Sequence, residues 1–370
     1  MSSSTGIPAG YVLEGRLGND DAMLVSDPRI NRKLAEIMKA VGLDKRQPDS
    51  KLSISSPLEE IRAAVAQSEP PMQGMYDMMD MSLPGDDKEA KVEHSVTTIK
   101  GEDGHEIKLH VFRQAGMEGT GLPCVMYTHG GGMTIINTFN PVHERWCKSL
   151  ALGGVVAIMP DFRNAYTKEA HNPFPIGLND CVAAARYIAD HKSEFGISKL
   201  VLQGESGGGN LAIATALKAN KEGWVKSING VYGAVPYISN AWGWPKERLV
   251  KELPSTIASD GYFLGVKWME LLGHYYTPDP KSAVDPFAWP YHATDDMVKG
   301  LPEHYLAMDE LDPLRDEGKA YYQKLTRNGV KVAGHVNLGM AHGTWLIMRQ
   351  NLWEVNQAMV DSVVAFAKRV

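Results

Sequence analysis

A serine between glycines has the surroundings that most favour chemistry in this chain. Ser206 lies in the motif GESGG at 204–208, after the apolar, strand-like run 199–203 and before the helix-like run 210–217. A sharp turn from strand to helix strains the backbone at the serine, and glycines let the neighbouring chain approach closely. Such a turn holds the hydroxyl clear of the sheet, and the N-terminus of the helix presents free N–H groups beside it. The motif is weak evidence alone, but its context favours a nucleophile.

A run of three glycines follows another predicted strand. The motif HGGG occupies 129–132, directly after the strand-like run 124–128. Three glycines permit a turn whose successive N–H groups point into one space, which suits a developing oxyanion. The alternative for this segment is a plain flexible loop. Its pairing with the turn at Ser206 favours the oxyanion.

Three aspartates near a later strand-like run, 305–308, are candidates for a carboxylate that orients an imidazole. Asp312 lies in a turn where the following proline restricts the backbone, and a carboxylate there could hold a histidine in one tautomer. We expect Asp316 and Glu317 to favour the first turn of the next helix through its dipole. Asp309 is expected to be an exposed loop carboxylate.

One of the twelve histidines follows these acids in a loop rich in glycine. His342 lies in the segment 339–343, after the last predicted strand, and Gly343 follows it. His335 falls inside a strand pattern and His129 inside the glycine turn, where we expect structural roles. His342 is therefore the candidate general base.

Together these motifs resemble the bacterial hormone-sensitive-lipase family of carboxylesterases. The resemblance rests on HGGG, GESGG, the motif DPLRDEG at 312–318 and the late His-Gly, and it runs from about Val125 to the end of the chain. The segment 162–175 is similar to the family's YRLAPE…PFPA segment, although the Pro-Glu pair is missing. The order serine, aspartate, histidine is also that of α/β-hydrolases.

The resemblance implies a role for each motif. Ser206 would be the nucleophile, Asp312 the orienting acid and His342 the base. The oxyanion would be held by the backbone N–H groups of Gly131, Gly132 and Gly207. Two departures stand out, since the family's GDSAG is GESGG here and its usual phenylalanine after His-Gly is Thr344. Backbone donors survive the first change, and the second puts details of the histidine loop in doubt.

The pattern of elements predicts an α/β fold, an α/β-hydrolase with a mostly parallel sheet, helices on both faces and a helical cap. Asp103-Gly104 predicts a hairpin at the start of the sheet. Strands are predicted over 96–100, 106–112, 124–128, 155–159, 200–203, 228–235, 305–308 and 330–336. Helices are predicted over 178–191, 211–220, 317–328 and 352–368.

We expect four segments: an N-terminal helical cap segment at 1–92, a first part of the core at 93–238, a cap insertion at 239–288 and a second part of the core at 289–370. Apolar spacing from 30 to 41 predicts a helix, and Ser56 to Glu59 predicts a capping box that starts another. Four of the eight tryptophans (242, 244, 268 and 289) lie in or beside the insertion. They predict a lid, with a satellite hydrophobic cluster as the alternative.

Five methionines between residues 72 and 81 precede the first strand, at positions 72, 75, 78, 79 and 81. Methionine fills irregular gaps and adaptable pockets. Core filling is the simpler interpretation, and the lining of a loosely specific substrate pocket is the alternative.

Composition limits the possible partners. The chain has 370 residues and a net charge of −6, which argues against nucleic acid. Its start shows no secretory pattern, and the apolar run 150–160 is too short to cross a bilayer and predicts a buried strand. Three cysteines without C-x-x-C spacing suggest reduced thiols in a cytoplasmic protein, each filling the core.

We therefore expect a soluble serine carboxylesterase that acts on short- to medium-chain or bulky apolar esters, with lactones among the candidates. The expected partner is a small-molecule ester, without nucleic acid or stable membrane association, and the protein is expected to be a monomer or homodimer. No metal or organic cofactor is expected, because HExxH, Walker and Rossmann patterns are missing. The alternatives are a serine peptidase or amidase on the same fold, and a non-catalytic ligand-binding homologue.

Overall fold

An eight-stranded sheet runs through the middle of the molecule in the order β1-β2-β4-β3-β5-β6-β7-β8. The computed structural model describes residues 13–45, 50–86 and 91–370. β1 and β4 both pair antiparallel with β2, and all other neighbours are parallel. The strands are β1 (Val92–Lys100), β2 (Glu106–Gln114), β3 (Leu122–Thr128), β4 (Val156–Pro160), β5 (Ile197–Glu205), β6 (Gly230–Ala234), β7 (Glu303–Asp309) and β8 (Val332–Asn337).

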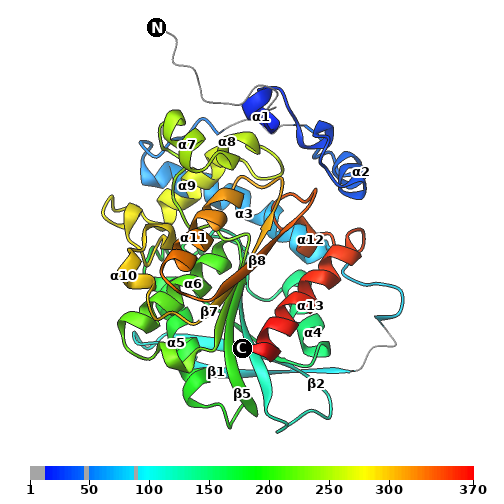
Figure 1. Cartoon of the computed structure of the whole chain (residues 1–370), viewed down its shortest axis with the longest axis vertical. Helices are drawn as coiled ribbons and strands as arrows, with labels where there is room; N and C mark the ends of the chain where they lie inside the picture. The colour runs from blue at the N-terminus through cyan, green and yellow to red at the C-terminus, as the bar shows by residue number, and fades with distance from the viewer. Residues whose placement is uncertain (1–12, 46–49, 87–90) are drawn as a thin grey trace.

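Helices cover both faces of this sheet (Figure 1). α4 and α13 lie on one face, and α5, α6 and α11 lie on the other. Every residue of β4 and of β6 is buried, as expected for strands covered on both sides. The helices of the core are α4 (Pro141–Leu152), α5 (Ile176–Asp190), α6 (Gly207–Lys221), α10 (Asp295–Val298), α11 (Arg315–Arg327), α12 (Thr344–Ile347) and α13 (Trp353–Arg369).

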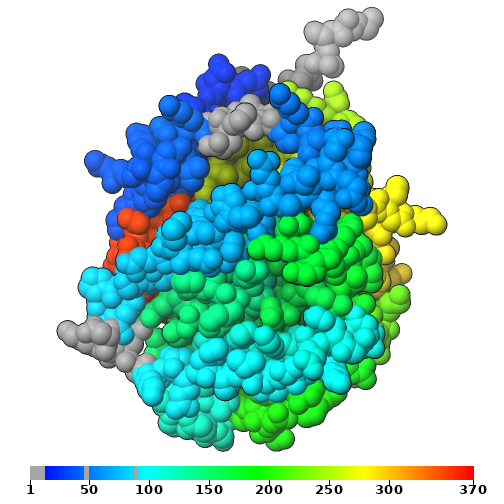
Figure 2. All heavy atoms as spheres, turned by 180° about the vertical axis from the view of Figure 1, so that it is seen from behind, coloured from blue at the N-terminus to red at the C-terminus, as the bar shows by residue number. Residues whose placement is uncertain are grey.

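The remaining helices gather at one end of the molecule (Figure 1). They are α1 (Gly15–Gly18), α2 (Arg32–Ala40), α3 (Leu58–Met78), α7 (Lys246–Glu252), α8 (Ser255–Ala258) and α9 (Val266–Tyr276). α3 contacts both α9 and the core helix α4. Figure 2 shows α3 in light blue, running across the back of the molecule between the darker N-terminal residues and the green residues of the core.

The sequence predicted the fold class and each of the eight strands correctly. Two local expectations were wrong, and one core helix was missed. Pro57 is the N-cap of α3, while the Ser56 hydroxyl accepts from the Ser53 N–H, so the capping box does not form. The segment 150–160 is the end of α4 followed by β4, not one strand. No helix was predicted at α4, whose N-cap Asn140 accepts from the N–H groups of residues 142 and 143.

Candidate active site

Ser206 occupies a strained turn between β5 and α6. Its φ of 55° and ψ of −121° lie in a region that residues with a side chain rarely adopt. The chain is crowded there, because a Cβ on Gly208 would lie 1.9 Å from the Thr128 carbonyl oxygen. A Cβ on Gly204 would lie 2.2 Å from the Gly208 carbonyl oxygen. The glycines around the serine are therefore required by the turn, as the sequence predicted.

The three predicted triad residues meet at the carboxyl ends of the strands. The Ser206 Oγ lies 2.9 Å from His342 Nε2, and His342 Nδ1 lies 2.8 Å from Asp312 Oδ2. With its proton on Nδ1, the imidazole donates to Asp312 and accepts from the Ser206 hydroxyl. All three residues are buried, Asp312 completely. The second oxygen of Asp312 accepts from the Leu314 N–H at 2.8 Å, which fixes the carboxylate.

The electrostatics of this site favour the protonated imidazole. Burial lowers the pKa of His342, but the charge and hydrogen bond of Asp312 outweigh it, so that the pKa lies above the usual 6.5. Asp309 and Glu205 act in the same direction when they are ionised. An imidazole in this environment can take up a proton from the serine.

The glycine turn faces the serine. Gly131 and Gly132 have φ values of 96° and 61°, which favour glycine. A Cβ on Gly207 would lie 2.8 Å from the Gly132 nitrogen, so the start of α6 and the glycine turn touch. Neither Gly131 nor Gly132 donates its N–H to another residue within the described ranges. These N–H groups are therefore available to an oxyanion in the space beside Ser206.

Buried polar residues hold the glycine turn in place. His129 Nδ1 lies 2.7 Å from the Gly130 carbonyl oxygen, and burial lowers the pKa of this histidine to about 3. The neutral ring shapes the turn, in agreement with the structural role expected for it. The Gly130 N–H donates to Glu205, whose pKa is raised to about 8 by burial. The segment 162–166 adds a bond from the Ala165 N–H to the Met133 carbonyl at 2.8 Å.

The acids around Asp312 are placed differently from the prediction. Asp309 is fully buried rather than exposed: it lies at the end of β7 and accepts hydrogen bonds from the last residue of β8 and from the loop that follows β8. Asp316 and Glu317 do lie in the first turn of α11, but each reaches out of the helix. Asp316 pairs with Arg315 and accepts from the Ser255 N–H at 2.7 Å. Spacing in the sequence does not reveal these tertiary partners.

A mostly apolar cavity of about 100 Å³ opens beside Ser206 and His342. Met72 and Met75 of α3 line it, whereas Met81 is buried elsewhere in the core and Met78 is 82% exposed. Both methionine hypotheses are thus correct in part. From the insertion, the cavity is lined by Phe263, Leu264, Trp268, Met269 and Leu272. The segment 239–288 therefore forms part of the cavity wall beside Ser206.

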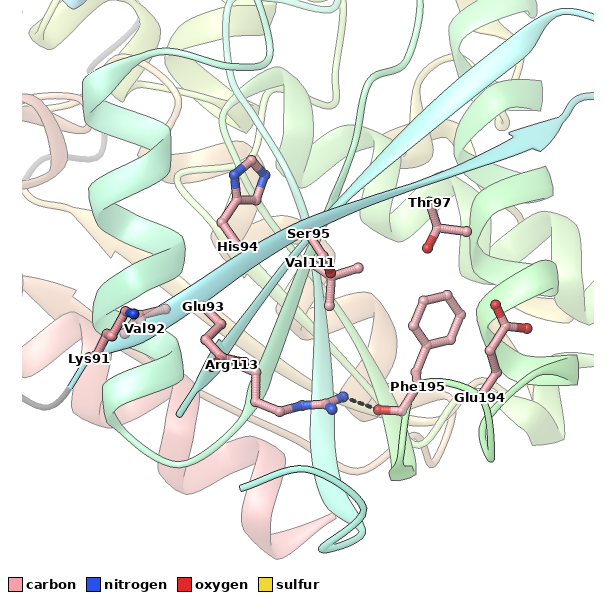
Figure 3. A pocket seen from close by; sticks show the side chains of 10 residues that line it. All are labelled: Lys91, Val92, Glu93, His94, Ser95, Thr97, Val111, Arg113, Glu194 and Phe195. Carbon is pink, nitrogen blue, oxygen red and sulfur yellow. Dashed lines mark hydrogen bonds between the residues drawn. The ribbon is translucent and has the colours of Figure 1, made fainter. Parts of the chain in front are cut away.

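A second hollow lies against β1, β2 and the loop before β5 (Figure 3). Its charged side chains have mixed signs: Lys91 and Arg113 face a space that Glu93 and Glu194 also line. Arg113 donates to the Phe195 carbonyl across it. None of the predicted catalytic residues lines this hollow.

Among the described residues, no three or more His, Cys, Asp or Glu side chains are grouped so as to hold a metal ion. In the same residues, no helix is both long and apolar enough to cross a membrane. The three cysteines are buried and unpaired, consistent with core filling.

Comparisons with known proteins place the chain in a family. Residues 125–346 match a family model described as the alpha/beta hydrolase fold. Esterase LipI of Mycobacterium tuberculosis is 28% identical over 60% of this chain, and carboxylesterase NlhH of the same species is 28% identical over 60%. The matched part spans 65% and 66% of the length of these two relatives.

Solved structures give a more extensive match. Brefeldin A esterase, described as a bacterial homologue of human hormone-sensitive lipase, has a TM-score of 0.94 and 47% identity over 96% of this chain and 98% of its own. Esterase Est22 has a TM-score of 0.80 and 30% identity, over 94% of this chain and 100% of its own. The chain therefore belongs to the α/β-hydrolase-fold family, among the bacterial esterases homologous to hormone-sensitive lipase.

Proposed function

We propose that the protein is a serine carboxylesterase that acts through an acyl-enzyme. The observation that carries this proposal is the hydrogen-bonded chain from Ser206 through His342 to Asp312, which opens into an apolar cavity. Relatives named as esterases and carboxylesterases support the same reaction class. A non-catalytic homologue would have no need of this complete constellation.

Ser206 Oγ attacks the ester carbonyl carbon while His342 Nε2 takes the hydroxyl proton. Asp312 stabilises the imidazolium that results. When the tetrahedral intermediate collapses, the bond to the alcohol oxygen breaks and His342 returns its proton to that oxygen. Water then attacks the acyl-enzyme with His342 again as base, which releases the acid and restores the serine.

The negative oxygen of each tetrahedral intermediate is held by the N–H groups of Gly131, Gly132 and Gly207. Two of these N–H groups have no acceptor among the described residues, and the third starts α6, where the helix dipole also favours negative charge. Each such donor is worth about 3 kcal/mol of barrier reduction. Backbone donors of this kind act without rearrangement during the reaction.

The proposed substrates are short- to medium-chain or bulky apolar carboxylic esters, with lactones among the candidates. The cavity presents mainly methionine, aromatic and aliphatic side chains. Among its lining residues there is no arginine or lysine that could anchor a peptide carboxylate, which favours esters over peptides. We also propose that segments 1–92 and 239–288 form one cap over the core segments 93–238 and 289–370, because both contribute to the cavity wall.

The proposal places the enzyme in a reducing compartment such as the cytoplasm. Its three cysteines are unpaired and buried, and burial raises the pKa of the Cys124 thiol above its usual value. Such thiols are core residues, unsuited to nucleophilic attack.

A fluorophosphonate label tests the nucleophile directly. The wild-type protein should be labelled on Ser206, and Ser206→Ala should abolish both the labelling and the hydrolysis of p-nitrophenyl esters while the circular dichroism spectrum stays unchanged. Appreciable turnover by Ser206→Ala would contradict the assignment. A series of esters of increasing acyl length, compared with matched amides, then separates an esterase from an amidase.

A further inference from the structure

A buried carboxylate outside the triad is attached to the loop that carries the base. Asp309 ends β7 and is fully buried. Its Oδ2 accepts from the Gly343 N–H at 2.8 Å, and its Oδ1 accepts from Asn337 Nδ2 at 2.8 Å. The mechanism above gives this side chain no role.

Gly343 directly follows His342 in the chain, so its amide controls the position of the imidazole. Gly343 has a φ of 62° and is the N-cap of the short helix α12. The preceding side of the histidine is also fixed, because the Leu311 N–H donates to the Met340 carbonyl at 2.9 Å. The loop that carries the acid thus holds the loop that carries the base on both sides of His342.

The carboxylate also contributes charge. Burial raises the pKa of Asp309 to about 7, and the nearby charge of Asp312 acts in the same direction. In turn, an ionised Asp309 raises the pKa of His342. Asp309 also interacts with Tyr232 of β6. Burial is the main reason that the pKa of Tyr232 lies above its usual value, so this side chain is neutral. The pair Asp309 and Asp312 together offers more negative charge to an imidazolium than one carboxylate alone.

We propose that Asp309 is a positioning residue for the esterase reaction, which keeps His342 within reach of Ser206 through the Gly343 amide and adds negative charge beside the imidazolium. This inference rests on the proposed function. A carboxylate that only stabilised the fold would change the melting temperature without changing the pH dependence of turnover. The two roles therefore give different kinetic results.

Two variants separate the amide contact from the charge. Asp309→Asn keeps an oxygen for the Gly343 N–H but removes the charge, and Asn337 can turn its amide to match. We expect its kcat at the pH plateau to stay within about threefold of wild type. The acid limb of kcat/KM should move to lower pH by about half a unit, because the pKa of His342 falls when the neighbouring charge is lost.

Asp309→Ala removes both contributions. We expect kcat to fall at least about tenfold while KM changes less than about threefold, because Asp309 does not line the cavity. The matched control is Asp316→Asn, an acid of the same segment that contacts Arg315 and Ser255 instead of the histidine loop. Its acid limb should coincide with that of wild type.

The role of Asp309 can be tested even if Asp309→Ala fails to fold, because Asp309→Asn alone tests the shift of the acid limb. Unchanged midpoints in Asp309→Asn, or an equal shift in Asp316→Asn, would overturn the inference. Failure of the proposed function would look different: the wild-type protein would then neither take up fluorophosphonate at Ser206 nor hydrolyse esters. Labelled and active wild type with unaffected Asp309 variants would reject only the role of Asp309.

Discussion

The protonation of His342 determines the pH range in which the proposed site can work. The base must be neutral to accept the serine proton. Burial lowers the pKa of His342, but Asp312 raises it by a larger amount, so the net shift is upward from 6.5. Protonation on acidification therefore begins at a higher pH than for an exposed histidine. We expect kcat/KM to fall on the acid side with a midpoint above about pH 6.5.

The measurement is a kcat/KM profile for an uncharged ester between pH 5 and 9. Activity that remained constant well into the range where ordinary carboxylates titrate would exclude His342 as the base.

Asp312→Asn should lower the plateau of kcat/KM on the order of 10³-fold, since the imidazole loses both its orientation and the charge that stabilises its cation. Asp316→Asn serves as the control and should lose far less activity.

Gly207 is a second residue at which a small change has a defined result. A Cβ there would lie 2.5 Å from the Met133 nitrogen and 2.8 Å from the Gly132 nitrogen. The family's GDSAG has alanine at this position, but here the space for a methyl group is filled by the backbone of Gly132 and Met133. Backbone cannot give way as a flexible side chain can, so Gly207→Ala should push the glycine turn away from Ser206. We expect kcat to fall at least about tenfold with little change in KM, as measured by steady-state kinetics. Wild-type kcat in Gly207→Ala would show that the turn tolerates a methyl group.

Single residues were predictable where the chemistry restricts the residue type. The strained turn requires glycines around Ser206, and His342 stood out as a histidine followed by glycine in a late loop. Asp312 was preferred over Asp309 and Asp316 mainly because of the resemblance to the family. The buried position of Asp309 could not be predicted, because the sequence does not show whether an aspartate at the end of a strand is exposed or buried. Its partner Gly343 is 34 residues away in the chain.

Between elements, Arg62 joins α3 to the insertion. Its Nη1 donates to the Tyr275 hydroxyl at 2.8 Å, its Nη2 donates to the Thr167 carbonyl at 3.2 Å, and its guanidinium lies 5.3 Å from the centre of the Tyr166 ring. α3 also carries Met72 and Met75 into the cavity wall. The position of that wall therefore depends on this one side chain and on the apolar contacts of α3.

Arg62→Ala should loosen the cavity wall without touching the triad. We expect KM for apolar esters to rise about threefold to tenfold, while kcat changes less than about twofold. The control is Arg32→Ala on α2, whose side chain is 93% exposed and pairs with Glu36. Steady-state kinetics on the same ester would check both. An unchanged KM for Arg62→Ala would mean that α3 is held by its apolar face alone.

Helices and strands were predictable where the pattern of apolar residues was regular and turn residues marked the ends. The strands of the core are short apolar runs bounded by turns, and all eight were found. α4 was missed because its sequence mixes charged, aromatic and small residues, and its N-cap is a single asparagine. α3 contains Pro70 and Pro71, which normally argue against a helix interior. Its packing against α4 and α9 outweighs that local preference.

At the scale of the whole molecule, the insertion is anchored to the core by a buried acid. Glu317 of α11 accepts from the Ile238 N–H at 2.6 Å and from the Ser239 hydroxyl. Ile238 and Ser239 lie where the chain leaves the core for the insertion. Burial raises the pKa of Glu317 to about 8, above its ordinary value of 4.5. Between pH 4.5 and about 8, Glu317 is therefore protonated in the folded protein and ionised in the unfolded chain.

This difference links stability to pH with a definite sign. The contribution of Glu317 is most favourable below pH 4.5 and is lost as pH rises towards about 8. Glu317→Gln keeps an acceptor for the Ile238 N–H and adds a donor for Ser239, but it cannot ionise. We expect its melting temperature relative to wild type to rise between pH 5 and about 8 and to level off above that, as measured by calorimetry. If the melting temperatures of the two proteins changed with pH in parallel, the pKa of Glu317 would be the same in the folded and unfolded states. Solvent would then reach the carboxyl group at the junction between core and insertion.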